Sequence, residues 1–240
     1  MRSLLPALLL LAVARAAPEN LLPREGSGWE GFKAGSWAKI KTTFAPEGRV
    51  PSVTLTVDKL TKVGEKDLTL QSEVKEAVGL ERTTERTVPR RGEAATTEKA
   101  EPVETLADEE VAAAGKSYAC TCTRTTISGP DGKRVITEWR AREPLLRVKR
   151  LEKTFDKAGT ATSTYTMLLT GTGERRMVGK REVACLRYRT LRRAGAQESE
   201  GEALVSSAVP GGTVSFDEKH SRDGKVLLQI RLECLDFESK

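Results

Sequence analysis

The sequence has few of the side chains on which enzyme active sites depend. Its 240 residues include one histidine, His220, and only three tryptophans, three tyrosines and five phenylalanines. His220 would have to be the base of any Ser-His-Asp triad, but its neighbour Ser221 would point to the opposite face of a strand. No G-x-S-x-G, H-E-x-x-H or phosphate-binding glycine motif is present. We therefore expect a protein that is not an enzyme, with no catalytic residue, cofactor or metal site.

Long hydrophobic runs are also missing. The longest covers residues 4–13 and is half as long as the roughly 20 residues that a membrane-spanning helix needs. A basic residue precedes it, and Ala14 and Ala16 follow at the spacing that a signal peptidase requires. Residues 1–16 are therefore predicted to be a signal peptide. We expect a chain exported to the periplasm or secreted, with no transmembrane segment.

Cysteine is scarce as well, with four residues at 120, 122, 185 and 234. In an oxidising compartment an even number favours two disulfides. Cys120 and Cys122 lie two apart on one predicted strand, where their Cα atoms would be about 6.5 to 7 Å apart, at or beyond the disulfide limit. We expect each to pair with one of Cys185 and Cys234. Free, buried thiols are the alternative. A metal site of Cys120, Cys122 and His220 is disfavoured, because the spacing is not C-x-x-C.

Positive charge is concentrated in one part of the chain. The net charge is +6, and residues 133–193 contain 17 lysines and arginines against 6 acidic residues. The simplest interpretation is a solvated face of charged strands, and the alternative is a surface for an anionic glycan or lipid headgroup. Nucleic acid is disfavoured as a partner, because the aromatic residues of this stretch are too widely separated to stack successive bases.

Alternating apolar and polar residues predict β-strands over most of the chain. The first predicted hairpin has one apolar face, which would combine Val53, Leu55 and Val57 with Leu68 and Leu70. Three more hairpins are predicted across glycine-containing turns at residues 129–132, 156–159 and 222–225. The predicted fold is all-β: an antiparallel meander of repeated hairpin units that forms a curved sheet, a sandwich or an open barrel.

Composition divides the mature chain into three segments. Residues 17–82 are predicted to form a first β unit. Residues 83–110 are rich in Thr, Glu, Ala, Arg and Pro with sparse apolar residues, so we expect a flexible linker or long surface loop. Residues 111–240 are predicted to form a β region with two related units, 111–173 and 177–238.

The two units are suggested by a recurring pattern. A Gly-Lys pair is followed after a short interval by Ala-Cys and then by Arg-Thr, once from Gly115 to Thr125 and again from Gly179 to Thr190. Each copy ends in a hairpin closed by a glycine, Gly159 in the first and Gly224 in the second. The pattern favours an internal repeat of β units, with chance similarity of Thr-rich strands as the alternative.

The motif Val209-Pro210-Gly211-Gly212 leads into the last pair of predicted strands. A secreted chain of successive hairpins with this motif resembles the exported bacterial β-repeat proteins whose role is undefined. It is more distantly similar to the unclosed β-barrels of the periplasmic lipoprotein carriers. The resemblance covers mainly residues 111–237. Those carriers hold an acyl chain in a concave apolar cavity covered by helices, and this chain offers no amphipathic helix as a lid.

These observations favour an exported, non-enzymatic binding or structural protein of the cell envelope or exterior, with an unknown partner. The first alternative is a carrier of a lipid or other apolar ligand in a concave β-sheet. The second is a carboxylate-dependent hydrolase that would use Glu198, Glu200 and Glu202, which alternate and would share one strand face. Three like charges at this spacing more often mark a solvated edge.

Overall fold

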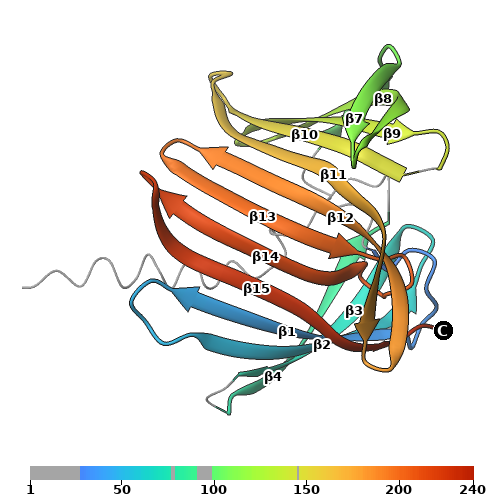
Figure 1. The fold of residues 1–240 in the computed structure, drawn as a ribbon, viewed down its shortest axis with the longest axis vertical. Coiled ribbons are helices and arrows are strands. Elements are labelled where there is room, and N and C mark those ends of the chain that lie inside the picture. The colour runs from blue at the N-terminus through green and yellow to red at the C-terminus, as the bar shows by residue number, and fades with distance from the viewer. Residues whose placement is uncertain (1–27, 77–78, 91–98, 145) are drawn as a thin grey trace, which may run out of the picture.

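The computed structural model describes residues 28–76, 79–90, 99–144 and 146–240 (Figure 1). The predicted signal peptide, residues 1–16, lies outside these residues. The described chain consists of strands and turns without a helix, so the all-β prediction is confirmed. The strands are β1 (Trp37–Pro46), β2 (Ser52–Val63), β3 (Asp67–Glu76), β4 (Glu81–Pro89), β5 (Lys99–Ala100), β6 (Glu104–Thr105), β7 (Glu109–Ala113), β8 (Lys116–Gly129), β9 (Gly132–Ala141), β10 (Leu146–Asp156), β11 (Ala161–Val178), β12 (Arg181–Ala194), β13 (Gln197–Val205), β14 (Thr213–Arg222) and β15 (Lys225–Glu238).

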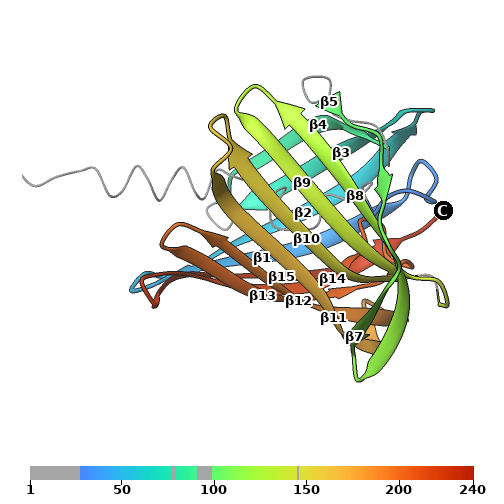
Figure 2. The same cartoon turned by 90° about the horizontal axis from the view of Figure 1, so that it is seen from above.

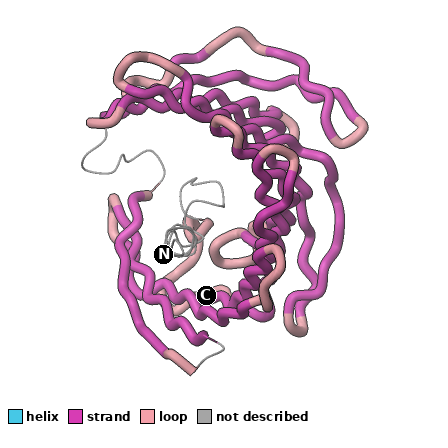
Figure 3. The backbone as a smooth tube through the Cα atoms, turned by 90° about the vertical axis from the view of Figure 1, so that its left-hand side faces the viewer, coloured by secondary structure: helices cyan, strands magenta, loops and turns pink. Residues whose placement is uncertain are grey.

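All of these strands belong to one antiparallel, 15-stranded sheet. Its order is β4-β3-β2-β1-β15-β14-β13-β12-β11-β10-β9-β8-β5, and β6 and β7 also pair with β8. Figures 2 and 3 show that the sheet curls, and Figure 3 shows its cross-section as an incomplete ring. Among the described strands β4 pairs only with β3, so the sheet is open at that edge. The predicted meander therefore forms an open curved sheet.

The two faces of the sheet differ sharply in exposure from β11 to β15. We call the face that carries the buried residues the inner face and the opposite one the outer face. Residues at the alternate positions, such as Arg189 and Glu202, lie on the outer face and have side chains more than half exposed. One row of inner-face residues, each directly opposite the next on the neighbouring strand, is Leu169, Tyr188, Ala203, Phe216 and Leu232.

All four predicted hairpins are present, as β2–β3, β8–β9, β10–β11 and β14–β15. The prediction of a single apolar face for the first hairpin is wrong. Its register places Val57 opposite Glu73, so the apolar residues of β2 and β3 lie on opposite faces along most of the hairpin. Leu60 is out of phase with Val57 and, in the same register, lies opposite Leu70; both are buried. The register of two paired strands decides which of their faces coincide, and the alternation within each sequence does not reveal that register.

The segment 83–110 differs from the predicted linker or surface loop. Its first residues belong to β4, which pairs with β3 along its whole length. Short pairings of β5, β6 and β7 with β8 follow, and residues 91–98 lie outside the described part of the chain. An edge strand needs a partner on one side only and buries little surface. A Thr-rich polar segment can therefore form one without the apolar residues that a central strand needs.

The Val209–Gly212 motif contributes to packing at one end of the sheet. The Gly211 amide donates to the carbonyl of Gly28 at 3.0 Å, and a Cβ added to Gly28 would lie 2.6 Å from the Gly211 carbonyl carbon. Gly211 has a φ of 82° and lies against the indole of Trp29, which is buried in the same cluster as Val209. Glycine is required at both positions for this close approach.

Candidate functional site

A cluster of ion pairs lies on the inner face of β9 and β10. The carboxylate of Glu138 is 2.8 Å from Nη2 of Arg140, and its Oε1 atom is 3.3 Å from both Nε of Arg147 and Nη1 of Arg150. Arg150 also contacts the second carboxylate, Glu152, at 2.9 Å. We call this group the arginine cluster. Its members are Arg134, Arg140, Arg147, Arg150, Glu138 and Glu152.

A β-bulge brings the two central arginines to one face. Residues 147 and 150 are three apart, and in a regular strand their side chains would point to opposite faces. The register of β10 with β9 shifts between Arg147 and Lys149, which inserts one extra residue. Arg147 and Arg150 therefore both reach Glu138 on the inner face. Bulges of this kind recur at sites where a strand has to redirect a side chain.

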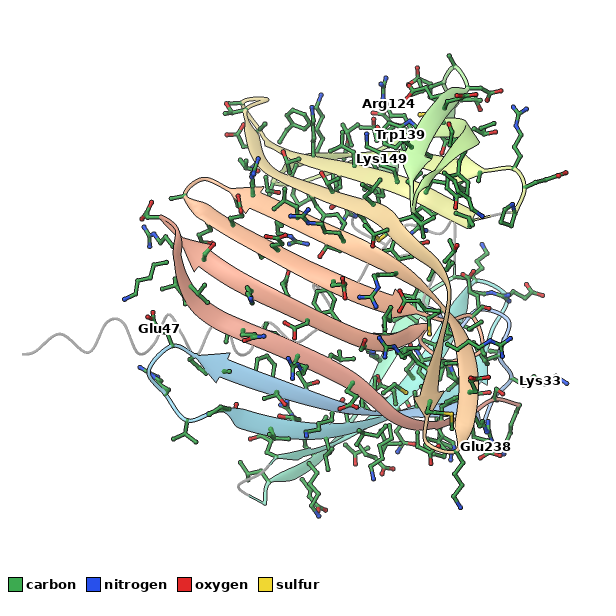
Figure 4. The ribbon with its side chains drawn as sticks, viewed as in Figure 1. Lys33, Glu47, Arg124, Trp139, Lys149 and Glu238 are labelled. Atoms are coloured by element: carbon green, nitrogen blue, oxygen red, sulfur yellow. The ribbon has the colours of Figure 1, made fainter. Side chains whose placement is uncertain are left out.

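The same bulge sends Lys149 to the other face. Its Nζ lies 4.5 Å from the centre of the Trp139 ring, and Figure 4 shows the two side chains close together at β9 and β10. The indole Nε1 of Trp139 donates to the carboxylate of Glu109 at 2.8 Å. Trp139 is buried and its polar atom is satisfied, so this contact has the character of structural packing.

The arginine cluster is shielded from water. The side chain of Arg150 is 6% exposed and that of Glu138 is 15% exposed. Burial, and next to it the charge of Arg150, lowers the pKa of Arg147 to about 10. The guanidinium nevertheless remains charged at neutral pH. The cluster consists of four guanidinium groups and two carboxylates.

Two buried hydroxyl groups lie beside this cluster. Tyr165 is opposite Glu152 and is 9% exposed; burial raises its pKa to about 12. Thr190 is opposite Met167, which is itself opposite Arg150, and it is 2% exposed. Neither hydroxyl has a hydrogen-bond partner among the described residues. Buried polar side-chain groups are rarely left without a hydrogen bond.

A second polar group lies further across the inner face. Oγ of Ser199 donates to Oε1 of Glu218 at 2.8 Å, and Nε2 of His220 lies 2.8 Å from Oε2 without the alignment of a hydrogen bond. In a catalytic triad the histidine lies between the serine and the acid, but here the acid lies between the other two. Ser221 bonds instead to the carbonyl of Glu198, so it diverges from His220 as the alternation of a strand predicts. This arrangement does not activate a serine nucleophile.

The inner face joins its apolar row directly to the arginine cluster. Tyr188 belongs to the row, and its hydroxyl donates to the backbone carbonyl of Arg147 at 2.9 Å. Met167 lies between Arg150 on β10 and Thr190 on β12, and both Met167 and Tyr188 belong to the main apolar cluster. The face is therefore amphipathic, with an apolar part that extends over β11 to β15 and a cationic part on β9 and β10.

The cysteines do not form the predicted disulfides. All four are free, buried thiols, and burial raises the pKa of each, that of Cys234 to about 11. Cys120 and Cys122 pack in one apolar cluster, while Cys185 and Cys234 pack in the other. Because β12 is the fourth strand from β8, it lies roughly 19 Å away along the sheet, far beyond disulfide reach. The described residues also contain no group of three His, Cys, Asp or Glu side chains that could hold a metal ion.

The basic stretch 133–193 is divided between the two faces. Its outer arginines form pairs with acids on neighbouring strands: Arg193 contacts Glu198 at 2.7 Å, and Arg189 contacts Glu200. Glu202 is likewise paired with an arginine of β12. The three candidate carboxylates therefore belong to an exposed ladder of ion pairs, as expected of a solvated face. The inner arginines gave no separate signal in the sequence.

The described outer face also has a hollow of 260 Å³ between β1 and β15. Its lining is mostly polar and mixes both signs of charge: Lys41, Thr43, Ala45, Gln229, Arg231 and Glu233. These residues alternate with the buried ones of the same strands, so the hollow faces away from the arginine cluster. It lacks the apolar floor and convergent polar groups that are typical of a ligand pocket.

No protein-family model and no curated protein matches the chain, but several solved structures are similar to it. An exported protein of YmcC-like fold from Bacteroides fragilis is 9% identical over 87% of this chain and 97% of its own, with a TM-score of 0.40. A lipoprotein from Parabacteroides distasonis is 8% identical over 89% of this chain and 99% of its own, with a TM-score of 0.39. A LolA superfamily protein from Nitrosomonas europaea is 6% identical over 96% of this chain and 93% of its own, with a TM-score of 0.36. Within the described residues, no helix has the length and hydrophobicity that crossing a bilayer requires.

Proposed function

We propose that this chain is an exported binding protein without catalytic activity, and that the inner face of its curved sheet binds a ligand with an acyl chain or a similar apolar body. The observation that carries the proposal is the continuous apolar row from Leu169 on β11 to Leu232 on β15. Apolar side chains gathered on the concave side of a sheet are the usual lining of a site for an apolar ligand.

The open edge of the sheet supports this proposal, because a ligand needs a route to the inner face. The described strands end at β4 on one side and at β8 with its short partners on the other, and no hydrogen bonds join β4 to β8. A closed barrel of the same strands would admit a ligand only at its ends. The proposed route for a long apolar chain is the seam beside β4.

The polar groups of the structure favour binding over catalysis. Glu218 separates Ser199 from His220, so the serine has no adjacent base. The carboxylates of Glu198, Glu200 and Glu202 lie on the outer face and are each paired with an arginine, so they do not face a substrate together. Hydrolysis of a glycoside would need two carboxylates on either side of one bond.

Export is part of the proposal and has a direct test. Expression of the full chain in a bacterial host, followed by N-terminal sequencing of the protein recovered outside the cytoplasm, should give a chain that begins at Ala17. Recovery of an uncut chain from the cytoplasm would contradict export.

The binding function is tested on the same exported protein. Solvent extraction and mass spectrometry should detect an acyl-containing ligand, and delipidated protein should bind the fluorescent fatty acid cis-parinaric acid. Ala203→Leu, which adds bulk to the inner face, should weaken this binding. The matched control Glu202→Leu changes the adjacent outer position and should leave it unchanged. A protein that neither retains acyl material nor binds the probe would refute the proposed function.

A further inference from the structure

We propose that one end of the sheet docks on the surface of an anionic phospholipid bilayer, through exposed apolar side chains at the tips of its hairpins. These side chains are Val50 in the β1–β2 turn, Val226 and Leu227 at the start of β15, and Leu80 just before β4. We call them the apolar rim. The docking goes beyond the proposed function, because it needs no ligand on the inner face.

The strand pairing places the apolar rim at one end of neighbouring strands. The amide of Glu47 donates to the carbonyl of Leu227 at 3.0 Å, so the β1–β2 turn lies directly beside the start of β15. Leu80 accepts a hydrogen bond from Glu76 at the end of β3, and β3 pairs with β2. Figures 1 and 2 show the β1–β2 and β14–β15 turns at the same end of the sheet, and Figure 4 labels Glu47 there. Paired strands are about 4.8 Å apart, so the rim from β4 to β15 is about 20 Å long.

The apolar rim differs from the rest of the surface in its exposure. Seven large apolar side chains are exposed among the described residues, and four of them belong to the rim; Val50 is 89% exposed. At the opposite end of the sheet, the apolar turn residue Val209 is 0% exposed, and Trp29 packs in the same cluster. Exposed apolar side chains that gather on one part of a surface mark an interaction site.

The charges on the two turns fit an anionic surface. Residues 47–51 and 222–225 include three basic and two acidic side chains. Lys225 lies 3.4 Å from Glu47, and Arg222 lies 3.9 Å from Asp223. Arg49 has no acidic partner among the described residues, so its charge is available to a lipid phosphate. A basic residue beside anionic headgroups strengthens binding, and its alkyl stem can lie against apolar side chains.

The backbone of the β1–β2 turn is also suited to the headgroup region. A segment that leaves water has to satisfy its backbone N–H groups within the protein. Pro46 and Pro51 have no N–H. The amides of Glu47 and Arg49 donate to the carbonyls of Leu227 and Pro46, at 3.0 and 3.2 Å. The turn therefore carries few unsatisfied donors into the lipid.

A bilayer fits this surface better than a folded partner does. The rim is a narrow row of turn tips, whereas a stable protein interface buries about 800 Å² on each partner. Interfacial binding requires only that apolar side chains enter the bilayer surface by about 5 to 10 Å. Val50 and Leu227 are exposed at the ends of hairpins, so they can enter without any change in the sheet.

Vesicle flotation tests the docking on the full chain without its predicted signal peptide. The protein should float with vesicles of phosphatidylcholine and phosphatidylglycerol. It should bind phosphatidylcholine alone about fivefold more weakly, and high salt should abolish the difference.

Four variants locate the contact. Val50→Ser and Leu227→Ser should each weaken binding to both kinds of vesicle about fivefold, because less apolar surface enters the lipid. Arg49→Gln should weaken binding to the anionic vesicles alone, also about fivefold. The matched control Met177→Ser replaces an apolar side chain that is 65% exposed at the opposite end of the sheet, and it should change neither.

A further pair of variants reports the contact without any loss of binding. Val50→Trp places an indole at the tip of the β1–β2 turn, where its fluorescence should shift to shorter wavelength with anionic vesicles and be quenched by brominated acyl chains. Met177→Trp should show neither change. Both positions are exposed, so neither substitution alters the core.

Absence of flotation with either kind of vesicle would overturn the docking, and such a protein could still bind cis-parinaric acid, which would leave the proposed function intact. Flotation that depends on Val50 in a protein that binds no cis-parinaric acid would support the docking and refute the proposed function. Equal losses for Val50→Ser and Met177→Ser would place the bilayer contact elsewhere and overturn the inference. Equal binding to the two kinds of vesicle would overturn the preference for anionic lipid. A dimer that Val50→Ser dissociates, in a protein that does not float, would assign the rim to contact between two copies of the chain.

Discussion

Arg147 and Arg150 lie on the same face of β10 and share one carboxylate oxygen. Nε of Arg147 and Nη1 of Arg150 are each 3.3 Å from Oε1 of Glu138. Residues three apart in a regular strand would point in opposite directions, so the shared contact depends on the bulge before Lys149. Glu138 therefore holds together two positive charges that would otherwise repel each other.

Replacing the shared acid tests this role. Glu138→Gln keeps the shape of the side chain and removes its charge, which leaves three arginines around a neutral amide. Removing one partner of a largely buried ion pair costs about 3 kcal/mol of unfolding free energy. Urea denaturation at pH 7 measures the loss.

The control for this substitution is Glu200→Gln on the outer face. Glu200 also pairs with an arginine, but its side chain is 51% exposed. An exposed ion pair contributes less than about 1 kcal/mol, so this variant should unfold close to wild type. Equal losses for the two variants would contradict a special role for Glu138.

Gly201 allows close packing at the centre of the inner face. A Cβ at this position would lie 2.9 Å from both the backbone oxygen of Asp217 and the hydroxyl of Thr190. Gly201→Ala should therefore destabilise the protein by about 1 to 3 kcal/mol through overpacking. Gly171→Ala is the matched control. Its Cβ would lie 3.1 Å from the end of the flexible side chain of Glu174 and 3.3 Å from the Cβ of Arg187, so smaller shifts than at Gly201 would relieve it. Urea midpoints that fall equally for both variants would contradict this account.

The strands and turns could be predicted because their signals are local. Alternating residues and turn glycines located the hairpin β14–β15, whose turn contains Gly224. The same signals located the three other hairpins. Strand β4 was missed because an edge strand can be polar on both faces and therefore resembles a loop in composition. The pairing of β1 with β15 joins residues about two hundred apart, such as Trp37 and Glu238, and no local pattern encodes it.

The candidate site could be predicted only as an excess of positive charge. The stretch 133–193 contains the arginine cluster, but alternation alone places Arg147 on the face opposite Arg150. The bulge that reverses this placement adds one residue to a strand and leaves no compositional signal. The cysteine pairing failed for a related reason, because sequence spacing does not show that Cys120 and Cys185 belong to separate clusters.

The four thiols should be unreactive in the folded protein. They are buried, and burial raises the pKa of each, so little thiolate exists at pH 8. Iodoacetamide should modify none of them within minutes in buffer and all four in guanidinium chloride without reductant, as counted by mass spectrometry. Fewer than four modified thiols in unreduced, unfolded protein would restore the disulfides predicted from the sequence.

The buried hydroxyl of Tyr165 should make stability fall at high pH. Burial raises its pKa to about 12 in the folded protein, against about 10 in the unfolded chain. The folded state therefore keeps a proton that the unfolded state loses, and the free energy of unfolding decreases as the pH rises through this window. The part due to Tyr165 is about 1 kcal/mol between pH 9 and pH 11. Urea denaturation at both values should show a smaller decrease for Tyr165→Phe than for wild type. Buried thiols and Tyr188 shift in the same direction in both proteins, so the difference isolates Tyr165. Identical decreases would mean that the hydroxyl is solvated in the folded protein and that its pKa is not raised.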